Sequence, residues 1–186
     1  MSRVAPLEDA AIDDPELRAL MARAAALGVP DPLFARILAR VPGHARVLLR
    51  ALLVTHEADG VDHRLKEIIR IALARFAGDR YFAALRSTRA RAAGLDEARI
   101  EAGCGDYEDD PRFTEAERAA LRYAEQMYLD AGKIDAAFYA DLKKHYTEAQ
   151  IMELGAFIAF HYSMQVFMRS LDAVPLPHPA VVSPAH

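Results

Sequence analysis

Helix start signals follow one another along the chain and constrain its fold more than any other feature. Each places a side-chain oxygen where it can accept the free backbone amides of a first helical turn. Two pair an aspartate with a following proline, and two fit the capping-box pattern. The four clearest signals are Asp14-Pro15, Asp31-Pro32, Thr114 with Glu117, and Thr147 with Gln150. No stretch alternates apolar and polar residues for more than a few positions, so the sequence predicts an all-α fold.

The spacing of start and stop signals predicts a bundle of about eight or nine helices. The expected ranges are 15–27, 33–41, 44–58, 62–77, 79–93, a short helix from 96, 115–130, a shorter helix near 136–145, and 148–171. The 186 residues suit one domain that buries its own core. We expect a single domain over 1–186, with a core over about 30–172 and a proline-rich arm over 174–186.

Composition excludes several classes of function. The net charge is -4 and the basic residues are scattered, which argues against a nucleic-acid partner. The N-terminus lacks the apolar run of a secretory signal, and the longest charge-free apolar run, 154–168, is too short to span a bilayer. We therefore expect a cytoplasmic protein with no membrane partner. The single cysteine, Cys104, forms no internal disulfide, Cys-x-x-Cys couple or thiolate metal cage.

The helix expected over 148–171 is apolar on nearly every face. Such a helix lies either at the centre of a large core or between subunits. An all-α chain of this length has few layers with which to cover it, so the pattern favours a homo-oligomer over a central core helix.

The stretch from Glu67 to Leu95 resembles the core of the alkylhydroperoxidase D (AhpD) and carboxymuconolactone decarboxylase superfamily. It reads EIIRIALARFAGDRYFAALRSTRARAAGL. Peroxidatic members carry a glutamate, a Cys-x-x-Cys twelve residues later, and a histidine four residues after the second cysteine. Here Glu67 keeps the glutamate position, Asp79 and Phe82 stand at the cysteine positions, and Arg86 stands at the histidine position. The resemblance implies an AhpD-like helical bundle that forms dimers, trimers or hexamers and lacks the family's redox chemistry.

Arg86 and Arg89 are candidates for binding an anion. On a continuous helix over 79–93, a turn of 100° per residue places Asp79, Phe82 and Arg86 on one inward side. Arg89 falls on the same side. A buried guanidinium needs a carboxylate or an anionic ligand. The pattern is compatible with a clamp for a small carboxylate, with a structural salt bridge, and with an arginine that reaches water.

Glu67 has two interpretations. Periodicity over 62–77 places it opposite the apolar stripe, as a solvated ion pair with Arg70. The resemblance instead implies that Glu67 faces a pocket, where the family's glutamate belongs to a proton relay. Burial there would raise its pKa towards the range of a general base, and Arg86 would lower it again.

The residues around the lost cysteines have more modest roles. Tyr81 either donates to a developing enolate or carboxylate oxygen, or lies in the core with its hydroxyl paired. Asp79 caps a helix and Phe82 shapes a pocket wall, and both are candidates for contact with the substrate. The histidines lack metal-ligand spacing, and His161 fits a core histidine with one hydrogen bond. We expect no metal and no cofactor.

These observations predict a non-redox acid–base enzyme of the decarboxylase, lyase or isomerase type. Its substrate would be a small carboxylated or enolisable molecule. Glu67 would transfer the proton, Arg86 would bind the anionic group with Arg89, and Tyr81 would assist. One alternative is an inert paralogue that binds a ligand or a partner. Another is residual thiol peroxidase activity through Cys104, whose acidic neighbours make it a poor nucleophile.

Overall fold

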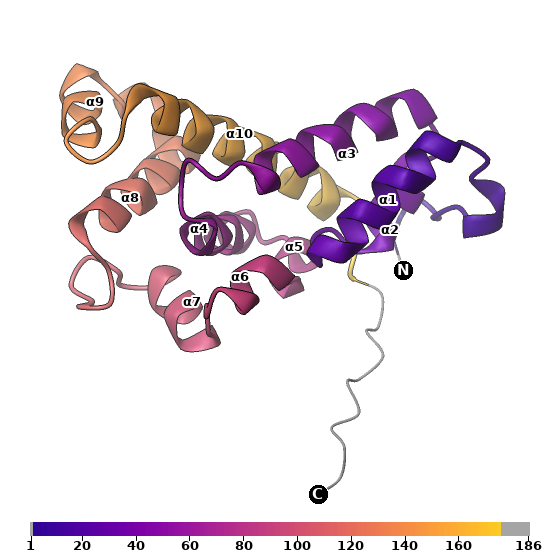
Figure 1. Ribbon diagram of the computed structural model, residues 1–186, viewed down its shortest axis with the longest axis horizontal. Helices are drawn as coiled ribbons and strands as arrows, with labels where there is room; N and C mark the ends of the chain where they lie inside the picture. The colour runs from indigo at the N-terminus through magenta and orange to yellow at the C-terminus, as the bar shows by residue number, and fades with distance from the viewer. Residues whose placement is uncertain (1, 176–186) are drawn as a thin grey trace, which may run out of the picture.

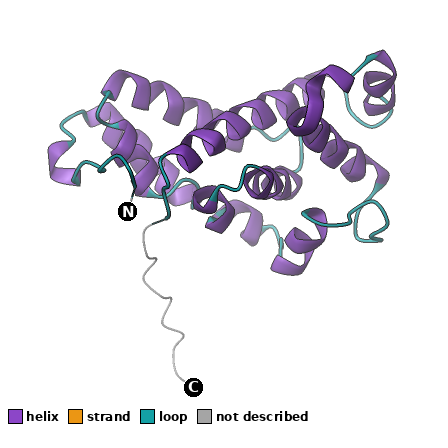
Figure 2. Cartoon of the chain, turned by 180° about the vertical axis from the view of Figure 1, so that it is seen from behind, coloured by secondary structure: helices purple, strands orange, loops and turns teal. Residues whose placement is uncertain are grey.

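The computed structural model describes residues 2–175, and within that range it contains helices and no strand (Figures 1 and 2). The predicted all-α fold is confirmed. The helices are α1 (Pro15–Leu27), α2 (Pro32–Leu38), α3 (Pro42–Glu57), α4 (His63–Phe76), α5 (Arg80–Ala84), α6 (Thr88–Ala92), α7 (Glu97–Gly103), α8 (Glu115–Asp130), α9 (Ala136–Leu142) and α10 (Glu148–Ser170), with short 3₁₀ turns η1 (Asp9–Ala11) and η2 (Ala131–Lys133). The expected proline-rich arm lies almost wholly outside the described residues.

Helix ends follow the sequence signals. The carboxylates of Asp14 and Asp31 accept backbone amides at the starts of α1 and α2. Thr114 and Thr147 form complete capping boxes at the starts of α8 and α10. Gly94, with a φ of 89°, follows α6 in the left-handed region that glycine tolerates best. Local signals thus fix the ends of most elements.

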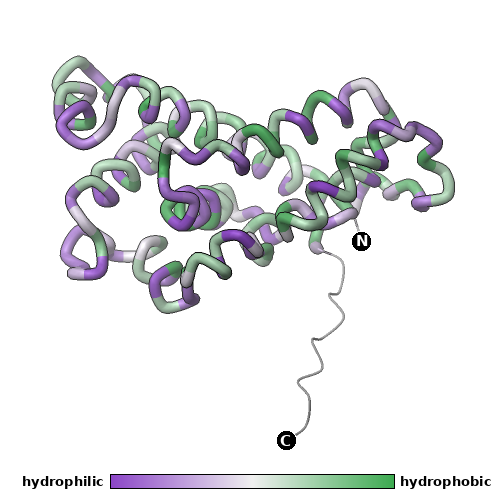
Figure 3. Tube along the Cα trace, viewed as in Figure 1, coloured by the Kyte–Doolittle hydropathy of each residue, from purple (hydrophilic) through white to green (hydrophobic). Residues whose placement is uncertain are grey.

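Helix α4 is the centre of the molecule. Figure 1 views it nearly end-on, with the other helices arranged around it, and it packs against α5, α7, α8 and α10. Of its 14 residues, 11 are buried, including Lys66, Glu67 and Arg70. Figure 3 shows hydrophilic and hydrophobic residues together along this helix. Because Lys66, Glu67 and Arg70 are buried away from water, each needs a partner inside the protein.

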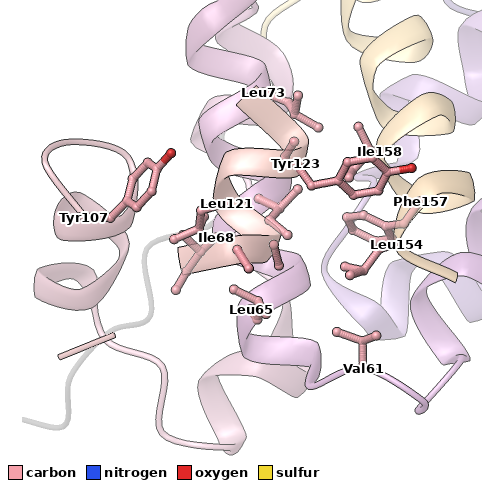
Figure 4. Packing of buried hydrophobic residues seen from close by; sticks show 14 of the residues in the cluster. Val61, Leu65, Ile68, Leu73, Tyr107, Leu121, Tyr123, Leu154, Phe157 and Ile158 are labelled. Carbon is pink, nitrogen blue, oxygen red and sulfur yellow. The ribbon is translucent and has the colours of Figure 1, made fainter. Parts of the chain in front are cut away.

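Two apolar clusters surround α4. One joins α4 to α7, α8 and α10, and Figure 4 shows Leu65 and Ile68 of α4 meeting Leu121, Leu154 and neighbouring side chains there. The other joins α1, α2 and α3 to α5 and the C-terminal end of α10. Figure 1 shows α7 and α8 towards one end of the molecule and α1 and α2 towards the other, with α10 running between the two ends. The charged residues of α4 lie between them.

The single helix expected over 79–93 is wrong, because the chain forms α5 and α6 with a break at 85–87. Leu85 is extended, with a ψ of 151°, and the Ser87 hydroxyl accepts the amide of Ala90 to start α6. Arg70 donates to the carbonyl oxygens of Phe82 and Leu85 at 2.6 and 2.8 Å. A buried guanidinium therefore satisfies carbonyls at the end of α5. Because the helix is interrupted, the residues after 84 do not lie on the faces predicted for them from a continuous helix.

Gly103 gives a direct test of the packing around α4. A Cβ at this position would lie 2.3 Å from Ile68 Cγ2 and 3.1 Å from Phe113 Cζ. We expect Gly103→Ala to destabilise the protein by about 1–3 kcal/mol, because both neighbours belong to the packed core. Urea unfolding followed by circular dichroism measures the change.

Gly43 provides the matched control. It lies in the first turn of α3, and a Cβ there would meet nothing within 4 Å. Gly43→Ala is expected to be neutral or slightly stabilising, since alanine favours the helix and nothing obstructs it. Equal losses in the two variants would contradict the close packing of α7 on α4.

Candidate functional site

Glu67 and Arg70 form a buried ion pair at the centre of the fold. Arg70 Nε donates to Glu67 Oε2 at 2.8 Å, and Arg70 Nη2 donates to Glu67 Oε1 at 2.7 Å. The two side chains are 1 % and 0 % exposed. The solvated pair that periodicity predicted is wrong, because α4 is covered on all sides rather than on one stripe. The burial of Glu67 that the family resemblance implied is confirmed.

The break between α5 and α6 completes the surroundings of this pair. The amide of Ser87 donates to Glu67 Oε1 at 2.7 Å. Burial alone would raise the pKa of Glu67, but the charge and hydrogen bonds of Arg70 and the Ser87 amide together hold it below its ordinary value. Burial and a guanidinium act in opposite directions, as expected, but the guanidinium is that of Arg70 and not of Arg86, and the lowering prevails. At neutral pH Glu67 is ionised.

Three histidines surround this ion pair. His56 Nε2 of α3 lies 3.0 Å from His161 Nε2 of α10, and His63 Nε2 lies 2.8 Å from the Ser87 hydroxyl. The His56 ring also lies 5.5 Å from the His63 ring, centroid to centroid. We refer to His56, His63, Glu67, Arg70 and His161 as the buried polar cluster. It joins the consecutive helices α3 and α4 to α10, which is far from them in the sequence.

The histidines of the buried polar cluster are neutral at physiological pH. Burial lowers the pKa of His56 to about 3 and that of His63 to about 4. Burial also holds the pKa of His161 well below its ordinary value, and the neighbouring cation Arg70 acts in the same direction. The Nδ1 atoms of all three rings, and Oε1 of Gln165, are buried without a hydrogen-bond partner. Such atoms are unusual in a folded interior and mark a place where a small polar molecule would gain hydrogen bonds.

Lys66 borders the buried polar cluster and anchors the turn before α4. Its Nζ donates to the carbonyls of Thr55 and Ala58 and to Glu153 Oε1 at 3.2, 2.6 and 2.6 Å. Burial lowers the pKa of Lys66. The lysine satisfies carbonyls at the end of α3 and ties that end to α10. These contacts hold His56 and His161 in position.

The structure does not bring Arg86 and Arg89 into the buried polar cluster. Arg86 Nε donates to Glu97 Oε1 at 2.9 Å at the protein surface, and Arg89 donates to the carbonyl of His56 at 3.0 Å from an exposed position. The inward face predicted for both residues is wrong because the break at 85–87 rotates this segment. Arg86 forms the structural salt bridge that was one of its three interpretations, and Arg70 takes the place beside Glu67.

Tyr81, Phe82 and Asp79 are buried but have structural contacts. The Tyr81 hydroxyl donates to Asp31 Oδ1 at 2.5 Å, so its hydroxyl is paired at the start of α2 rather than with Glu67. The Asp79 carboxylate accepts the amides of Tyr81 and Phe82 and caps α5, as the sequence predicted. The Phe82 ring lies 6.0 Å from the His161 ring and forms part of the wall of the buried polar cluster.

The described residues contain neither a metal-binding cluster nor an activated thiol. No group of three or more histidine, cysteine or acidic side chains within residues 2–175 is placed to hold a metal ion. Cys104 packs against the core beside α4, where burial raises the pKa of its thiol to about 11. A cavity of about 490 Å³ lies elsewhere, lined by Tyr107, Glu125, Phe138 and neighbouring residues.

Sequence reasoning missed most of the buried polar cluster. It treated His161 as a core histidine with one hydrogen bond, which is confirmed, but it did not join His161 to His56. Ser87 was not among the candidate residues, although a serine before Thr-Arg-Ala fits a helix cap. Lys66, Glu67 and Arg70 lie on an amphipathic helix, and nothing in the local pattern marks them as buried.

Comparison with known proteins supports the fold. The sequence matches no protein-family model and no curated protein. Among solved structures, the debrominase Bmp8 without ligand is 21% identical, with a TM-score of 0.78 over 93% of this chain and 91% of that one. An uncharacterised peroxidase-related protein from Ralstonia eutropha, described as an AhpD core, is 18% identical, with a TM-score of 0.77 over 94% and 92%. This chain has the AhpD-like fold.

A third AhpD-like structure extends the comparison. The peroxidase-related protein from Silicibacter is 14% identical, with a TM-score of 0.73 over 92% of each chain. The resemblance that the sequence showed is therefore confirmed at the level of the AhpD-like fold. These neighbours are a debrominase and two uncharacterised peroxidase-related proteins, so the fold alone assigns no chemistry to this chain.

Proposed function

We propose that this chain is a non-redox acid–base enzyme with the AhpD-like fold, and that the buried polar cluster is its proton-transfer site. Its substrate would be a small carboxylated or enolisable molecule. The observation that carries the proposal is that an ionised Glu67 shares one water-excluded cluster with three neutral histidines whose Nδ1 atoms lack partners. Buried ionisable side chains with strongly shifted pKa values that lie close together are typical of acid–base sites.

Each residue has a defined role in this proposal. Arg70, and not Arg86, supplies the positive charge that stabilises an anionic intermediate. The histidines donate or accept the proton at Nδ1. Phe82 excludes water from the wall of the cluster. The segment 85–87 covers the Glu67–Arg70 pair, because the Ser87 amide donates to Glu67 and the Leu85 carbonyl accepts from Arg70. In this proposal the segment moves aside to admit the substrate.

Glu67→Gln provides the functional test. In D₂O, proton exchange and decarboxylation of a panel of small oxo acids and unsaturated acids can be followed by NMR. We expect Glu67→Gln to lower turnover on the order of 10²-fold or more, while circular dichroism shows that the fold remains. Glu97→Gln changes the surface partner of Arg86, and Cys104→Ser removes the thiol. Both controls should retain full turnover.

Two outcomes would contradict this proposal. Unchanged turnover in the folded Glu67→Gln variant removes the proton-transfer role. Loss of activity in Cys104→Ser points to thiol chemistry instead, although the raised pKa of Cys104 speaks against it.

A ligand-binding protein without turnover is the second candidate. Both carboxylate oxygens of Glu67 already accept hydrogen bonds, and its lowered pKa makes it a weak proton acceptor. This observation favours binding over catalysis. A compound that raises the melting temperature of the wild-type protein without forming product would support this candidate.

A further inference from the structure

Gln165 of α10 is a buried glutamine that bonds to the buried polar cluster through only one end of its amide group. Its Nε2 donates to the backbone carbonyl of Arg70 at 2.8 Å. Since a carbonyl oxygen only accepts, this bond fixes the orientation of the amide and turns Oε1 away from that carbonyl. Oε1 is buried and has no hydrogen-bond partner among residues 2–175. Because an amide oxygen can only accept, it needs a donor from a ligand.

His161 carries a second unpaired atom one helical turn before Gln165. The two residues lie four positions apart on α10, so their side chains project from the same face of the helix. Both residues are 0 % exposed. His161 Nε2 lies 3.0 Å from His56 Nε2, whereas His161 Nδ1 has no partner within the described part of the chain. One buried face of α10 therefore carries an amide oxygen that accepts and a ring nitrogen that either donates or accepts.

The buried cations near this face have almost no hydrogen-bonding capacity left for a ligand. Lys66 Nζ donates to three acceptors, which uses every N–H of an ammonium group. Arg70 donates to both carboxylate oxygens of Glu67 and to two backbone carbonyls, which uses all but one of its N–H groups. A carboxylate at this face would meet the lone pairs of Gln165 Oε1 and would lack a free cation to balance its charge. An uncharged group with one proton to donate meets neither obstacle.

We propose that the site binds the hydroxyl group of an uncharged ligand, such as an enol, between His161 Nδ1 and Gln165 Oε1, and that Gln165 selects this group. The inference rests on the proposed function and narrows its substrate class from carboxylated or enolisable molecules to uncharged enolisable ones. The hydroxyl donates its proton to Gln165 Oε1, and its oxygen accepts from His161 Nδ1–H. A carboxylate has no such proton and is excluded.

The same arrangement fixes the positions of the ring protons on His56 and His161. With its proton on Nδ1, the neutral His161 ring has a lone pair on Nε2, which accepts from His56 Nε2–H. His56 Nδ1 then carries no proton. A bound hydroxyl group therefore holds the two rings in opposite tautomers, with the Nδ1 proton on His161. The tautomers can be observed without turnover, so they test the proposal independently of catalysis.

Phenol, anisole and benzoate test the selection in the wild-type protein. The phenol hydroxyl stands on an sp² carbon, as in an enol, and is uncharged at pH 7. Anisole has the same ring without the proton, and benzoate carries a carboxylate. Titration calorimetry is expected to show that phenol binds about tenfold or more tightly than either. In the phenol complex, long-range ¹H–¹⁵N NMR should find the ring proton on Nδ1 of His161 and on Nε2 of His56.

Gln165→Met tests the selecting residue itself. Methionine keeps the length of the side chain but removes the acceptor, so phenol affinity should fall about tenfold, to that of anisole, while anisole affinity is unchanged. Gln126→Met is the matched control, because Gln126 Nε2 also donates to a backbone carbonyl, that of Asp130 at 2.8 Å, but on the surface of α8. Phenol binding should not change in this variant. Circular dichroism checks that both variants remain folded.

Any of four results would overturn the proposal. They are phenol binding no tighter than anisole, benzoate binding as tightly as phenol, ring protons in the reverse positions, and a folded Gln165→Met variant that keeps the preference for phenol. Phenol affinity lost in Gln126→Met would also overturn it, because Gln126 lines the cavity beside Tyr107 and the ligand would then lie there. The first three results come from the wild-type protein and stand even if Gln165→Met does not fold.

The proposed function fails by a different measurement. Unchanged turnover in Glu67→Gln removes the proton-transfer role but leaves a hydroxyl-binding site if phenol is selected. Lost turnover in Glu67→Gln without selection of phenol leaves the proton-transfer role and removes only the hydroxyl specificity given to Gln165.

Discussion

Arg70→Met is expected to destabilise the protein by about 3–5 kcal/mol, a large part of the stability of a domain this size. The substitution keeps the length of the side chain but leaves the Glu67 carboxylate buried without its countercharge. It also removes the donors to the carbonyls of Phe82 and Leu85 at the break between α5 and α6. Denaturant unfolding at neutral pH, followed by circular dichroism, measures the loss.

An exposed ion pair provides the control for this prediction. Arg80 pairs with Asp172 at 2.7 Å, and both side chains are more than half exposed. Arg80→Met should cost less than about 1 kcal/mol because water replaces the lost partner. Combining Arg70→Met with Glu67→Leu removes both buried charges and should recover part of the loss. Similar costs for Arg70→Met and Arg80→Met would show that the buried pair is not what stabilises the centre of the fold.

Acidification is expected to unfold the protein well above the pH at which its carboxylates titrate. Burial holds the pKa of His56 at about 3 and that of His63 at about 4, below the ordinary 6.5. Between these values the unfolded chain binds protons that the folded chain does not, so the free energy of unfolding falls as pH falls. Each histidine contributes about 1.4 kcal/mol per pH unit, so His63 alone accounts for on the order of 3 kcal/mol. His161 acts in the same direction.

The charges around these rings determine the size of the effect. Lys66 and Arg70 of α4 and Arg89 beside α3 disfavour protonation of the histidines, whereas Glu67 favours it. The lowered pKa of Glu67 extends the loss of stability below pH 4.5. The free energy of unfolding, measured in urea, should therefore stay nearly constant from pH 7.5 to about pH 6.5 and decrease as the pH falls from there to 4.5.

A histidine substitution checks the source of this pH dependence. His161→Gln removes one buried ring and should flatten the dependence between pH 6.5 and pH 4.5, whatever its effect on stability at pH 7. His44→Gln changes an exposed histidine at the start of α3 and should leave the slope as it is. A slope that is the same in wild type and His161→Gln would contradict the role given to the buried rings.

The helices could be predicted from sequence because their ends depend on neighbouring residues. A side chain such as Thr114 caps a helix through contacts within three positions, so the signal and the structure are both local. The break at 85–87 escaped prediction because Leu85 and Arg86 are not helix breakers. It depends on Arg70, fifteen residues away from Leu85, which binds the carbonyl oxygens there.

The candidate site was harder to predict because its contacts also join residues that are far apart in the sequence. Glu67 was identified through the family resemblance, whereas periodicity placed it in water. Its partners come from three other segments: the Ser87 amide bonds to it, and His56 and His161 meet across the contact of α3 with α10. No local pattern indicates that a charged residue on an amphipathic helix will be covered on its polar side.

Asp79 and Phe82 have structural roles at the two positions that the family resemblance matches to the cysteines of peroxidatic members. The Asp79 carboxylate receives two amides at the start of α5, and the Phe82 ring lies 5.7 Å from the Phe34 ring. A cysteine provides neither the acceptor nor the bulk. Cysteines at positions 79 and 82 would therefore remove a helix cap and leave a void, so a Cys-x-x-Cys couple here would come at the expense of the stability of α5 and its packing.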